Sequence, residues 1–436
     1  MPRVAFITLG CKLNFAETST IGKQFLERGY EAVEFGQETD VCVINTCSVT
    51  GRADRECRQL IRRALRGTGK PFVIVTGCYA QLDPKAIAAI DGVDLVLGAQ
   101  EKFDFFRYVG PFEKNLYPHV FVSDIASVNN FGPAYSTEAG NRTRAYLKVQ
   151  DGCDFNCSFC TIPLARGGSR SQEREATLGQ ARALVAEGYK EIVLTGVNVG
   201  DYGKKLGIRL LNLLEHLVRI DGLHRIRISS IEPNLLSPDI LDFVAQADKM
   251  CKHFHIPLQS GADEILRRMR RRYTTAQYAD LIHAVRERIP RCGIGADVIV
   301  GFPGETDALF EQTHRFLTEL PVSYLHVFTY SERPNTPAPG FENAVEPKVR
   351  FQRSDKLRLL GIKKKRAFYE SMIGATVPVL AEDDVDGPMR FGFTGNYVRV
   401  GLPAATTSGN AIHQTEILGV ENDRCIGRVA ACEVVA

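Results

Sequence analysis

The sequence contains no tryptophan, no apolar run approaching the ~20 residues that span a bilayer, and no apolar leader behind Met1. We therefore expect neither a membrane protein nor a secreted one, but a cytoplasmic protein whose thiols stay reduced. Its twelve cysteines are then better interpreted as metal or cluster ligands than as disulfides. The sequence also has almost no net charge, because its 54 Lys and Arg residues are nearly balanced by 51 Asp and Glu residues. Any basic surface must come from uneven placement of these charges.

The length of 436 residues predicts two or three domains. Residues 1–126 alternate nearly continuous apolar runs with helical patterns, which favours a Rossmann-like parallel α/β domain with helices on both faces. The expected strands are 4–9, 40–45, 72–76 and 93–97, and the expected helices are 16–27, 53–66 and 84–89. Residues 127–142 are polar and rich in Asn, Gly and Ser, which is typical of a linker.

Residues 143–371 resume the alternation of strands and helices and end in a strongly basic helical stretch. The expected strands are 145–150, 191–195, 227–231, 253–258, 296–300 and 324–329. Six βα units fit a partial (β/α)6 barrel of the TIM type better than the full eightfold barrel. Residues 372–436 change to short β patterns, which indicate a small β barrel. The predicted fold class is therefore α/β, with a small β domain at the C-terminus.

Three cysteines follow the first strand of the second series. Cys153, Cys157 and Cys160 have the spacing C-x3-C-x2-C, with no fourth Cys or His nearby. A structural zinc site wants four protein ligands, whereas an iron–sulfur cubane accepts thiolates from one tight loop. Three thiolates leave one iron open for a small molecule. The alternative is three unligated or zinc-binding cysteines.

This spacing, with Phe159 just before the third cysteine, resembles the radical S-adenosylmethionine (SAM) superfamily. The resemblance implies that the amino and carboxylate groups of SAM chelate the open iron, and that the cluster cleaves SAM to a 5′-deoxyadenosyl radical. By resemblance and position, polar residues near the strand ends are expected to contact SAM, although strand-end polarity alone is the alternative. The expected SAM-binding residues are Phe159, Gly196, Asn198, Glu232 and Gln259.

A second group of cysteines is dispersed along the first domain. Cys11, Cys47 and Cys78 each lie at the carboxyl end of a different expected strand. Ligands of open α/β sheets bind outside those ends, so the three thiols could converge on one point and again leave an iron open. Small neighbours such as Gly10 and Gly77 would let the backbone approach a cluster closely. The alternative is three buried structural cysteines, since free cysteine is commonly buried.

The two cysteine trios, followed by a small C-terminal β domain, resemble the methylthiotransferases over essentially the whole chain. Other matching stretches are 165–171, 194–198, 257–261 and 301–306. The resemblance implies two [4Fe–4S] clusters, one that cleaves SAM at 153–160 and an auxiliary one at Cys11, Cys47 and Cys78 that anchors the inserted sulfur. It implies two SAM molecules, one methylating that sulfur and one yielding the radical that abstracts hydrogen from C2 of an adenine. We assign no side chain a catalytic role.

Residues 8–14, which read Thr-Leu-Gly-Cys-Lys-Leu-Asn, look most like the subfamily that acts on N6-threonylcarbamoyladenosine in tRNA, and 391–400 also resemble it. The subfamily acting on isopentenyladenosine usually has Gln-Met in place of Lys12-Leu13, and the one that modifies a ribosomal protein has Pro-Lys. The resemblance implies 2-methylthiolation of the adenosine 3′ to the anticodon, with a flavodoxin- or ferredoxin-type reductant and a sulfur donor as partners. The alternatives are the isopentenyladenosine or ribosomal-protein reaction and, in a different class, a non-catalytic RNA-binding module with zinc.

Clustered cations could contact the phosphates of tRNA, although a solvated helix face is the alternative. Arginines at three- and four-residue spacing share one face of the expected helix 53–66, and a further arginine cluster spans 267–272. The residues expected to bind nucleic acid are Arg55, Arg58, Arg62, Arg66, Arg270 and Arg271. The C-terminal domain resembles the RNA-binding TRAM domain, yet from residue 374 its four arginines face eight acidic residues, a net of −4. Any contact of this domain with tRNA must depend on a local patch or on shape.

Overall fold

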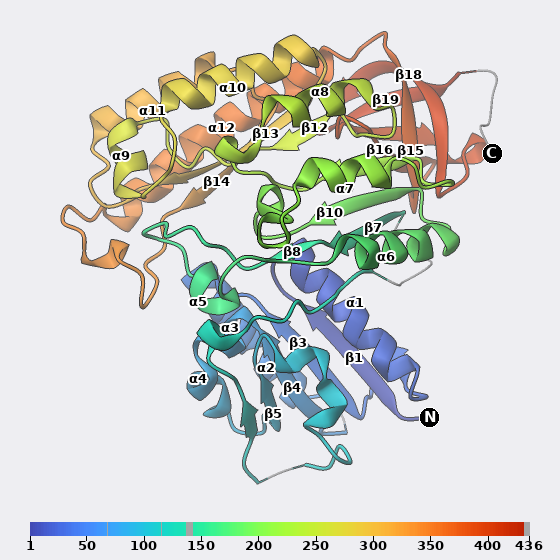
Figure 1. Cartoon of the computed structure of the whole chain (residues 1–436), viewed down its shortest axis with the longest axis vertical. Helices are drawn as coiled ribbons and strands as arrows, with labels where there is room; N and C mark the ends of the chain where they lie inside the picture. Colours follow the sequence, from blue (N-terminus) through green and yellow to red (C-terminus); the bar gives the residue numbers. More distant parts are fainter. Residues whose placement is uncertain (68, 115, 137–142, 431–436) are drawn as a thin grey trace.

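The chain folds into three units that pack against one another in the computed structural model (Figure 1). The structure describes residues 1–430 except 68, 115 and 137–142. The N-terminal unit is blue to teal, the strands from β7 to β14 form the central unit, and the red strands form the third. Among the helices of the described residues, none is long and apolar enough to cross a membrane.

The N-terminal unit is a six-stranded parallel sheet with the order β2-β1-β3-β4-β5-β6. The strands are β1 (Arg3–Thr8), β2 (Glu31–Val33), β3 (Val41–Thr46), β4 (Phe72–Gly77), β5 (Leu95–Leu97) and β6 (His119–Phe121). Every residue of β3 and β4 is buried, which explains why their sequences are nearly continuous apolar runs. Helix α1 (Lys12–Leu26) packs on one face, and α2 (Gly51–Leu65), α3 (Cys78–Leu82) and α4 (Pro84–Ala88) pack on the other. The Rossmann-like prediction is confirmed.

Two edge strands and the start of α1 differ from the sequence-based prediction. Strands β2 and β6 have three residues each and are mostly exposed, so they lack the apolar run that would reveal them. Helix α1 begins at Lys12 rather than at residue 16. Its first turns bury the polar residues Asn14 and Glu17, which interrupt the apolar periodicity of a surface helix.

The central unit is an open barrel of six parallel strands in sequence order. Its strands are β7 (Arg144–Lys148), β10 (Glu191–Thr195), β11 (Arg225–Ile228), β12 (His253–His255), β13 (Gly293–Val300) and β14 (Tyr324–Thr329). Two three-stranded halves meet where the backbone of Ile226 bonds to Lys249 and Cys251, at 2.7 and 2.8 Å. Its outer helices include α6 (Arg174–Ala186), α7 (Leu210–Leu217), α8 (Pro238–Gln246), α10 (Thr275–Arg288) and α11 (Asp307–Glu319). The predicted partial barrel is confirmed.

Side chains alternate along these strands between the apolar core under the helices and a polar barrel interior. Ile192, Leu194 and Ile226 belong to the core. The residues between them meet one another inside the barrel, where Arg227 Nε lies 2.7 Å from Glu191 Oε1. An interior lined with charges is unusual for a stable barrel and indicates a binding site.

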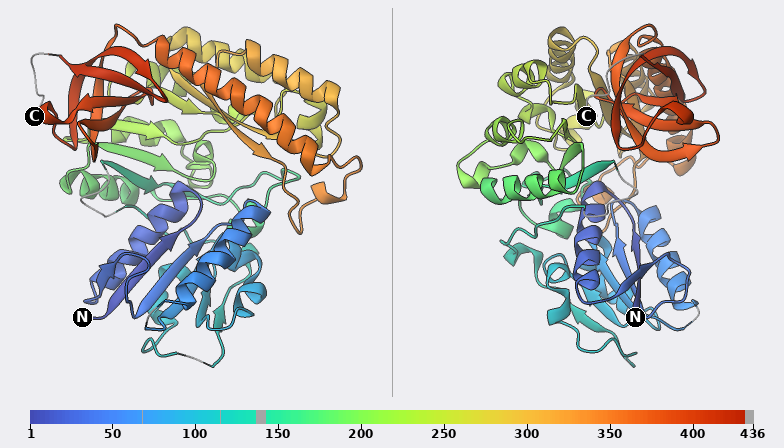
Figure 2. Two further views of the ribbon diagram at one scale, coloured as in Figure 1. Left: turned by 180° about the vertical axis from the view of Figure 1, so that it is seen from behind. Right: turned by 90° about the vertical axis from the view of Figure 1, so that its right-hand side faces the viewer.

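The third unit is a closed five-stranded barrel that follows the long helix α12 (Pro347–Glu370), which runs along the central unit (Figure 2). Its strands are β15 (Thr376–Asp386), β16 (Met389–Thr394), β17 (Arg399–Pro403), β18 (Ala411–Glu421) and β19 (Arg424–Val429). The predicted small barrel is confirmed. Its last strand is expected over 428–435, of which residues 431–435 lie outside the described residues. The β16–β17 turn meets the base of the central barrel. A Cβ on Gly293 of β13 would lie 2.1 Å from the Asn396 carbonyl oxygen, so only glycine fits there.

Part of the expected linker is bound to the central barrel. The backbone N–H of Ser136 donates to the Tyr146 carbonyl at 3.1 Å, and that of Lys148 donates to the Ala134 carbonyl at 3.0 Å. Strand β7 is the last strand of its sheet, so the backbone groups on its outer edge have no neighbouring strand to bond with. The linker residues provide hydrogen-bond partners for some of these groups. Residues 137–142 of the linker lie outside the described residues.

Candidate functional site

The cysteines at 153, 157 and 160 lie in the loop between β8 (Gln150–Asp151) and α5 (Ile162–Arg166), at the carboxyl end of the barrel. All three line one cavity of about 340 Å³. The backbone N–H groups of Phe155 and Ile162 point at the sulfurs of Cys153 and Cys160, at 3.4 and 3.5 Å. Such donors stabilise negative charge on sulfur, so the loop fits a cluster held by three thiolates.

Burial keeps the thiols of Cys153 and Cys160 protonated when no metal is bound. It raises the pKa of Cys153 to about 11 and that of Cys160 to about 12. A metal must therefore displace their protons on binding.

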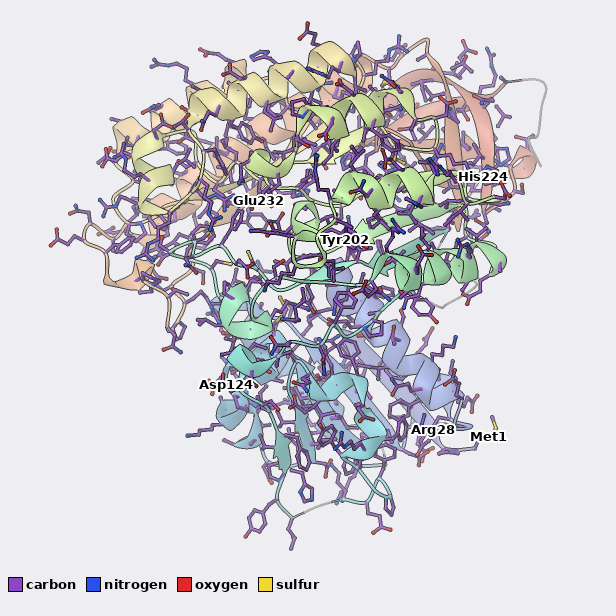
Figure 3. The ribbon with its side chains drawn as sticks, in the orientation of Figure 1. Met1, Arg28, Asp124, Tyr202, His224 and Glu232 are labelled. Atoms are coloured by element: carbon purple, nitrogen blue, oxygen red, sulfur yellow. The ribbon has the colours of Figure 1, made fainter. Side chains whose placement is uncertain are left out.

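Four of the five residues predicted to contact SAM line this same cavity, namely Phe159, Asn198, Glu232 and Gln259. Figure 3 labels Glu232 in the barrel half of the molecule, on the side away from the C-terminal barrel. Burial raises the pKa of Glu232 although Arg271 beside it favours the carboxylate. Gln259 has a φ of 72°, a left-handed conformation that costs energy in a residue with a Cβ and is typical of functional sites.

Gly196 is the fifth predicted SAM contact, and it is not among the residues that line the cavity. A Cβ at this position would lie 2.8 Å from Gln150 Oε1. That oxygen accepts a hydrogen bond from the Asn198 backbone N–H at 2.8 Å. The glycine therefore makes room for a side chain that holds Asn198 in place.

Arg271 does not lie where a phosphate-binding arginine was predicted. Its side chain is 3% exposed and points into the cavity rather than to solvent. Nη1 donates to Cys157 Sγ at 3.1 Å, and Nη2 donates to the Glu232 carboxylate. The prediction of a nucleic-acid contact is wrong for Arg271, because a charge run in sequence does not reveal which member points inward. Arg270 beside it is exposed, as a phosphate contact requires.

The second cysteine trio sits at the carboxyl ends of three neighbouring strands, β1, β3 and β4. Cys11 is exposed, whereas Cys47 and Cys78 are buried. A Cβ on Gly10 would lie 2.9 Å from Cys47 Sγ, so the turn that carries Cys11 touches the second thiol. Burial raises the pKa of Cys47 to about 12, and the nearby Cys78 adds to this rise. The three thiols therefore lie beyond the carboxyl ends of adjacent strands, where the ligands of one shared cluster would have to lie.

The chain directly after Cys47 reaches the cavity that holds the other trio. Val49 and Thr50 line that cavity. The segment after β14 holds them there, because Ser331 Oγ accepts from the Gly51 N–H at 3.0 Å and Arg333 bonds to Asp54 at 2.7 Å. The segment that follows Cys47 in the N-terminal unit therefore forms part of the wall of the cavity that holds the other trio.

The remaining predicted cations lie on α2 and, for Arg66, at the residue that caps its C-terminus. Arg55, Arg62 and Arg66 are exposed, while Arg58 is partly buried and donates to the Tyr79 hydroxyl at 2.7 Å. The buried side of the helix carries Cys57, Ile61 and Ala64. Its outer face is thus a row of exposed guanidinium groups.

Comparisons with known proteins identify the family. A model described as the radical SAM superfamily matches residues 147–317, and one described as uncharacterized protein family UPF0004 matches residues 3–98. Threonylcarbamoyladenosine tRNA methylthiotransferase MtaB of Bacillus subtilis (strain 168) is 42% identical, over 92% of this chain and 90% of that protein. The protein of the same name from Aquifex aeolicus (strain VF5) is 38% identical, over 88% and 93%. The chain belongs to the MtaB-type radical SAM methylthiotransferases.

Solved structures resemble this methylthiotransferase in fold. The radical SAM methyltransferase TsrM from Kitasatospora setae, with tryptophan and a SAM analogue bound, has a TM-score of 0.55 and 16% identity. The match covers 89% of this chain and 80% of that one. As a member of its family the chain uses SAM and two [4Fe–4S] clusters. Both cysteine trios fit such clusters in the chemistry and placement of their sulfurs.

Proposed function

We propose that this methylthiotransferase converts N6-threonylcarbamoyladenosine in tRNA to its 2-methylthio derivative, at the adenosine 3′ to the anticodon. The observation that supports this choice of substrate is the 42% identity, over nearly the whole chain, to a protein named for that nucleoside. We expect the reaction in the cytoplasm, with a flavodoxin- or ferredoxin-type reductant and a sulfur donor. The domains are then a methylthiotransferase domain (1–126), a linker (127–142), a radical SAM domain (143–371) and a TRAM-like domain (372–436).

The cysteine trios divide the chemistry between two domains. Cys153, Cys157 and Cys160 hold the cluster that cleaves SAM, and Cys11, Cys47 and Cys78 hold the auxiliary cluster. When bound, these clusters and SAM supply a radical that removes hydrogen from C2 of the adenine and the methylthio group that replaces it.

The chain's own side chains orient the reactants. Phe159, Asn198, Glu232 and Gln259 hold SAM in the cavity they share with the first trio. Arg271 fixes the Glu232 carboxylate and donates to Cys157, so it positions both. Because the segment after Cys47 lines the same cavity, the substrate base can lie between the two cluster sites.

The test is nucleoside analysis of tRNA from cells lacking the gene. We expect the 2-methylthio derivative of N6-threonylcarbamoyladenosine to disappear and the unthiolated nucleoside to accumulate, and a plasmid copy to restore both. An unchanged level of the 2-methylthio nucleoside would contradict the proposal. Loss of methylthiolated isopentenyladenosine, or of a methylthiolated ribosomal protein, would assign the chain to one of the other two reactions instead.

A further inference from the structure

Two histidines and an aspartate form one layer of the barrel interior. His255, Asp297 and His326 come from β12, β13 and β14, which are neighbouring strands of one sheet (Figure 1). Asp297 and His326 are partners in the parallel pairing of β13 with β14. Successive side chains of a strand point to opposite faces, so these three point away from the apolar core and into the barrel. Their sequence neighbours belong to that core, namely Phe254, Ile256, Ala296, Val298 and Val327.

The three side chains converge on one point. His255 Nε2 lies 2.8 Å from Asp297 Oδ1, and His326 Nδ1 lies 3.2 Å from the same oxygen. The three atoms all lie within 4.8 Å of one another. Ligand atoms that bind one metal ion at about 2.0–2.2 Å are themselves about 3 Å apart. Both nitrogen–oxygen distances are therefore close to those of a coordination shell.

Ser230 fixes the orientation of the His255 ring. The second nitrogen of this ring, Nδ1, lies 3.2 Å from Ser230 Oγ. A hydroxyl can accept a hydrogen bond from Nδ1–H, which leaves Nε2 without a proton and able to bind a metal ion. Histidine ligands of metals commonly have their second nitrogen fixed by such a partner. The ring of His255 is thus held with Nε2 directed at the point where the three side chains meet.

The charge of Asp297 is not neutralised by a permanent cation. Two other carboxylates that face the barrel interior do have one, since Glu191 pairs with Arg227 and Glu232 pairs with Arg271. Within the part of the chain that the structure describes, Asp297 has no lysine or arginine within ion-pair distance, and its partners are the two imidazoles. Burial opposes ionisation, yet hydrogen bonds from these imidazoles hold the pKa of Asp297 well below its usual value. A charged carboxylate between two imidazoles is a ligand set that a divalent cation would balance.

The layer also has room for an ion and for its remaining ligands. Asp297 lines the cavity of about 340 Å³ that holds the cysteine loop, and His326 lines a second cavity of about 550 Å³. The side chain of His326 is 53% exposed, and β14 is the end strand of its sheet. An ion can therefore reach the three ligand atoms from the open side of the barrel. Three protein ligands leave one position open, as in catalytic rather than structural zinc sites.

We propose that His255, Asp297 and His326 bind a divalent transition-metal ion of the Zn²⁺ class, in addition to the iron of the two clusters. Two imidazoles and one carboxylate suit such an ion, whereas Mg²⁺ and Ca²⁺ take oxygen ligands and iron–sulfur clusters take thiolates. The fourth position faces the cavities and is open to water or to an oxygen atom of the substrate. The inference goes beyond the proposed function and does not depend on which nucleoside is methylthiolated.

The test adds Zn²⁺ to the anaerobic enzyme whose two cluster sites are filled. After equilibrium dialysis against buffered, micromolar Zn²⁺, elemental analysis should find about one zinc atom per chain beside about eight iron atoms. His326→Ala and Asp297→Asn should each weaken zinc binding more than tenfold, because even the loss of an outer-shell partner commonly costs about 10–100-fold. Ser230→Ala should weaken it about tenfold. His283→Ala, on the exposed side of α10, is the matched control and should bind zinc as wild type does.

Cobalt provides a readout that is independent of metal content. Oxidised [4Fe–4S] clusters are diamagnetic, so the electron paramagnetic resonance of bound Co²⁺ can be recorded without overlap. Pulsed spectra should show coupling to the nitrogens of both imidazoles in wild type and of one imidazole in His326→Ala. Iron content and the denaturation temperature are measured for every variant, because an emptied cysteine site would bind zinc itself.

Two results would overturn the inference. One is wild type that binds no zinc beyond its iron, and the other is zinc binding that is undiminished in both His326→Ala and Asp297→Asn. In either case the three side chains would be a hydrogen-bonded layer and nothing more. Because His326 is half-exposed, its replacement should leave the fold intact, so this variant decides the test if Asp297→Asn proves unstable.

Discussion

Arg166 and Glu17 come from different units and form a buried salt bridge. Arg166 Nη1 lies 3.0 Å from Glu17 Oε1, and the two side chains are 3% and 0% exposed. Arg166 ends α5, the helix that follows Cys160, and Glu17 lies on α1, the helix that follows Cys11. The bridge therefore ties the segment that carries one cysteine trio to the segment that carries the other.

Replacing Arg166 with glutamine should loosen this connection. Glu17 would keep Lys102 at 2.6 Å and Lys148 at 3.1 Å, but it would lose its third cation. Breaking a buried ion pair by removing one partner costs about 3–5 kcal/mol, so we expect a clearly lower denaturation temperature under anaerobic conditions. Arg174→Gln, which removes an exposed pair with Glu175, should change stability by less than about 0.5 kcal/mol. Equal effects of the two substitutions would contradict this account.

The same network predicts how stability depends on pH. Burial opposes ionisation of Glu17, but Arg166, Lys102 and Lys148 together hold its pKa far below the usual range. The unfolded chain then binds this proton at a higher pH than the folded chain does. The stabilisation is complete above the unfolded pKa of about 4.3 and is lost as the pH falls below it. Between pH 7 and pH 3, the urea concentration at the midpoint of unfolding should fall less steeply for Glu17→Gln than for wild type. Parallel plots of this midpoint against pH for the two proteins would contradict the role given to Glu17.

The cysteine trios could be placed from sequence because a general rule of parallel sheets located them. Cys11, Cys47 and Cys78 each follow an apolar run, and parallel strands end at one sheet edge, where the structure has them. The buried charge of Arg166 escaped prediction because its partner Glu17 comes from another unit of the chain. Nothing in the local sequence pattern near residue 166 indicates a partner more than a hundred residues away. Strand β16 (Met389–Thr394) escaped as well, because a glycine at position 392 in its interior weakens the signal of a strand.

Removing the auxiliary trio should separate the two halves of the chemistry. In Cys11→Ala/Cys47→Ala/Cys78→Ala we expect iron to fall from about eight to about four atoms per chain. Cleavage of SAM to 5′-deoxyadenosine should persist, because the other trio lies in a different domain, while the methylthio nucleoside should no longer form. The measurement combines iron analysis with mass spectrometry of both products. Cys42→Ala, in the buried strand β3, is the control and should keep the full iron content. Continued methylthiolation by the triple variant would refute the assignment of these three cysteines to the auxiliary cluster.

Arg271→Met should impair SAM cleavage without affecting affinity for tRNA. The arginine is enclosed and bonds to Cys157 and Glu232, so its loss removes a donor to sulfur and frees the carboxylate. We expect at least a tenfold lower rate of 5′-deoxyadenosine formation, as is common when a group supporting metal ligands is removed. Arg270→Met, one residue away and exposed, should leave this rate unchanged. If the Arg271 variant bound tRNA more weakly but cleaved SAM normally, this account would be wrong. Arg271 would then bind phosphate, as the arginine cluster around it in the sequence suggests.

The outer face of α2 should supply part of the affinity for tRNA phosphates. Arg55, Arg62 and Arg66 are exposed, and together they form a row of cations on the surface of the N-terminal unit. Replacing all three with glutamine should weaken binding of substrate and non-substrate tRNA alike. It should also lower the slope of log affinity against log salt by about one for each phosphate that is no longer neutralised. Binding titrations at several salt concentrations measure both quantities.

The control for this α2 variant is Arg315→Gln, which makes the same Arg-to-Gln change on the exposed side of α11. It removes one exposed guanidinium from a helix that carries no such row, so we expect it to leave the salt slope at the wild-type value. An unchanged salt slope in the triple variant as well would mean that the outer face of α2 is only solvated surface. The phosphates would then have to be neutralised elsewhere, and the basic helix α12 would be the next element to test.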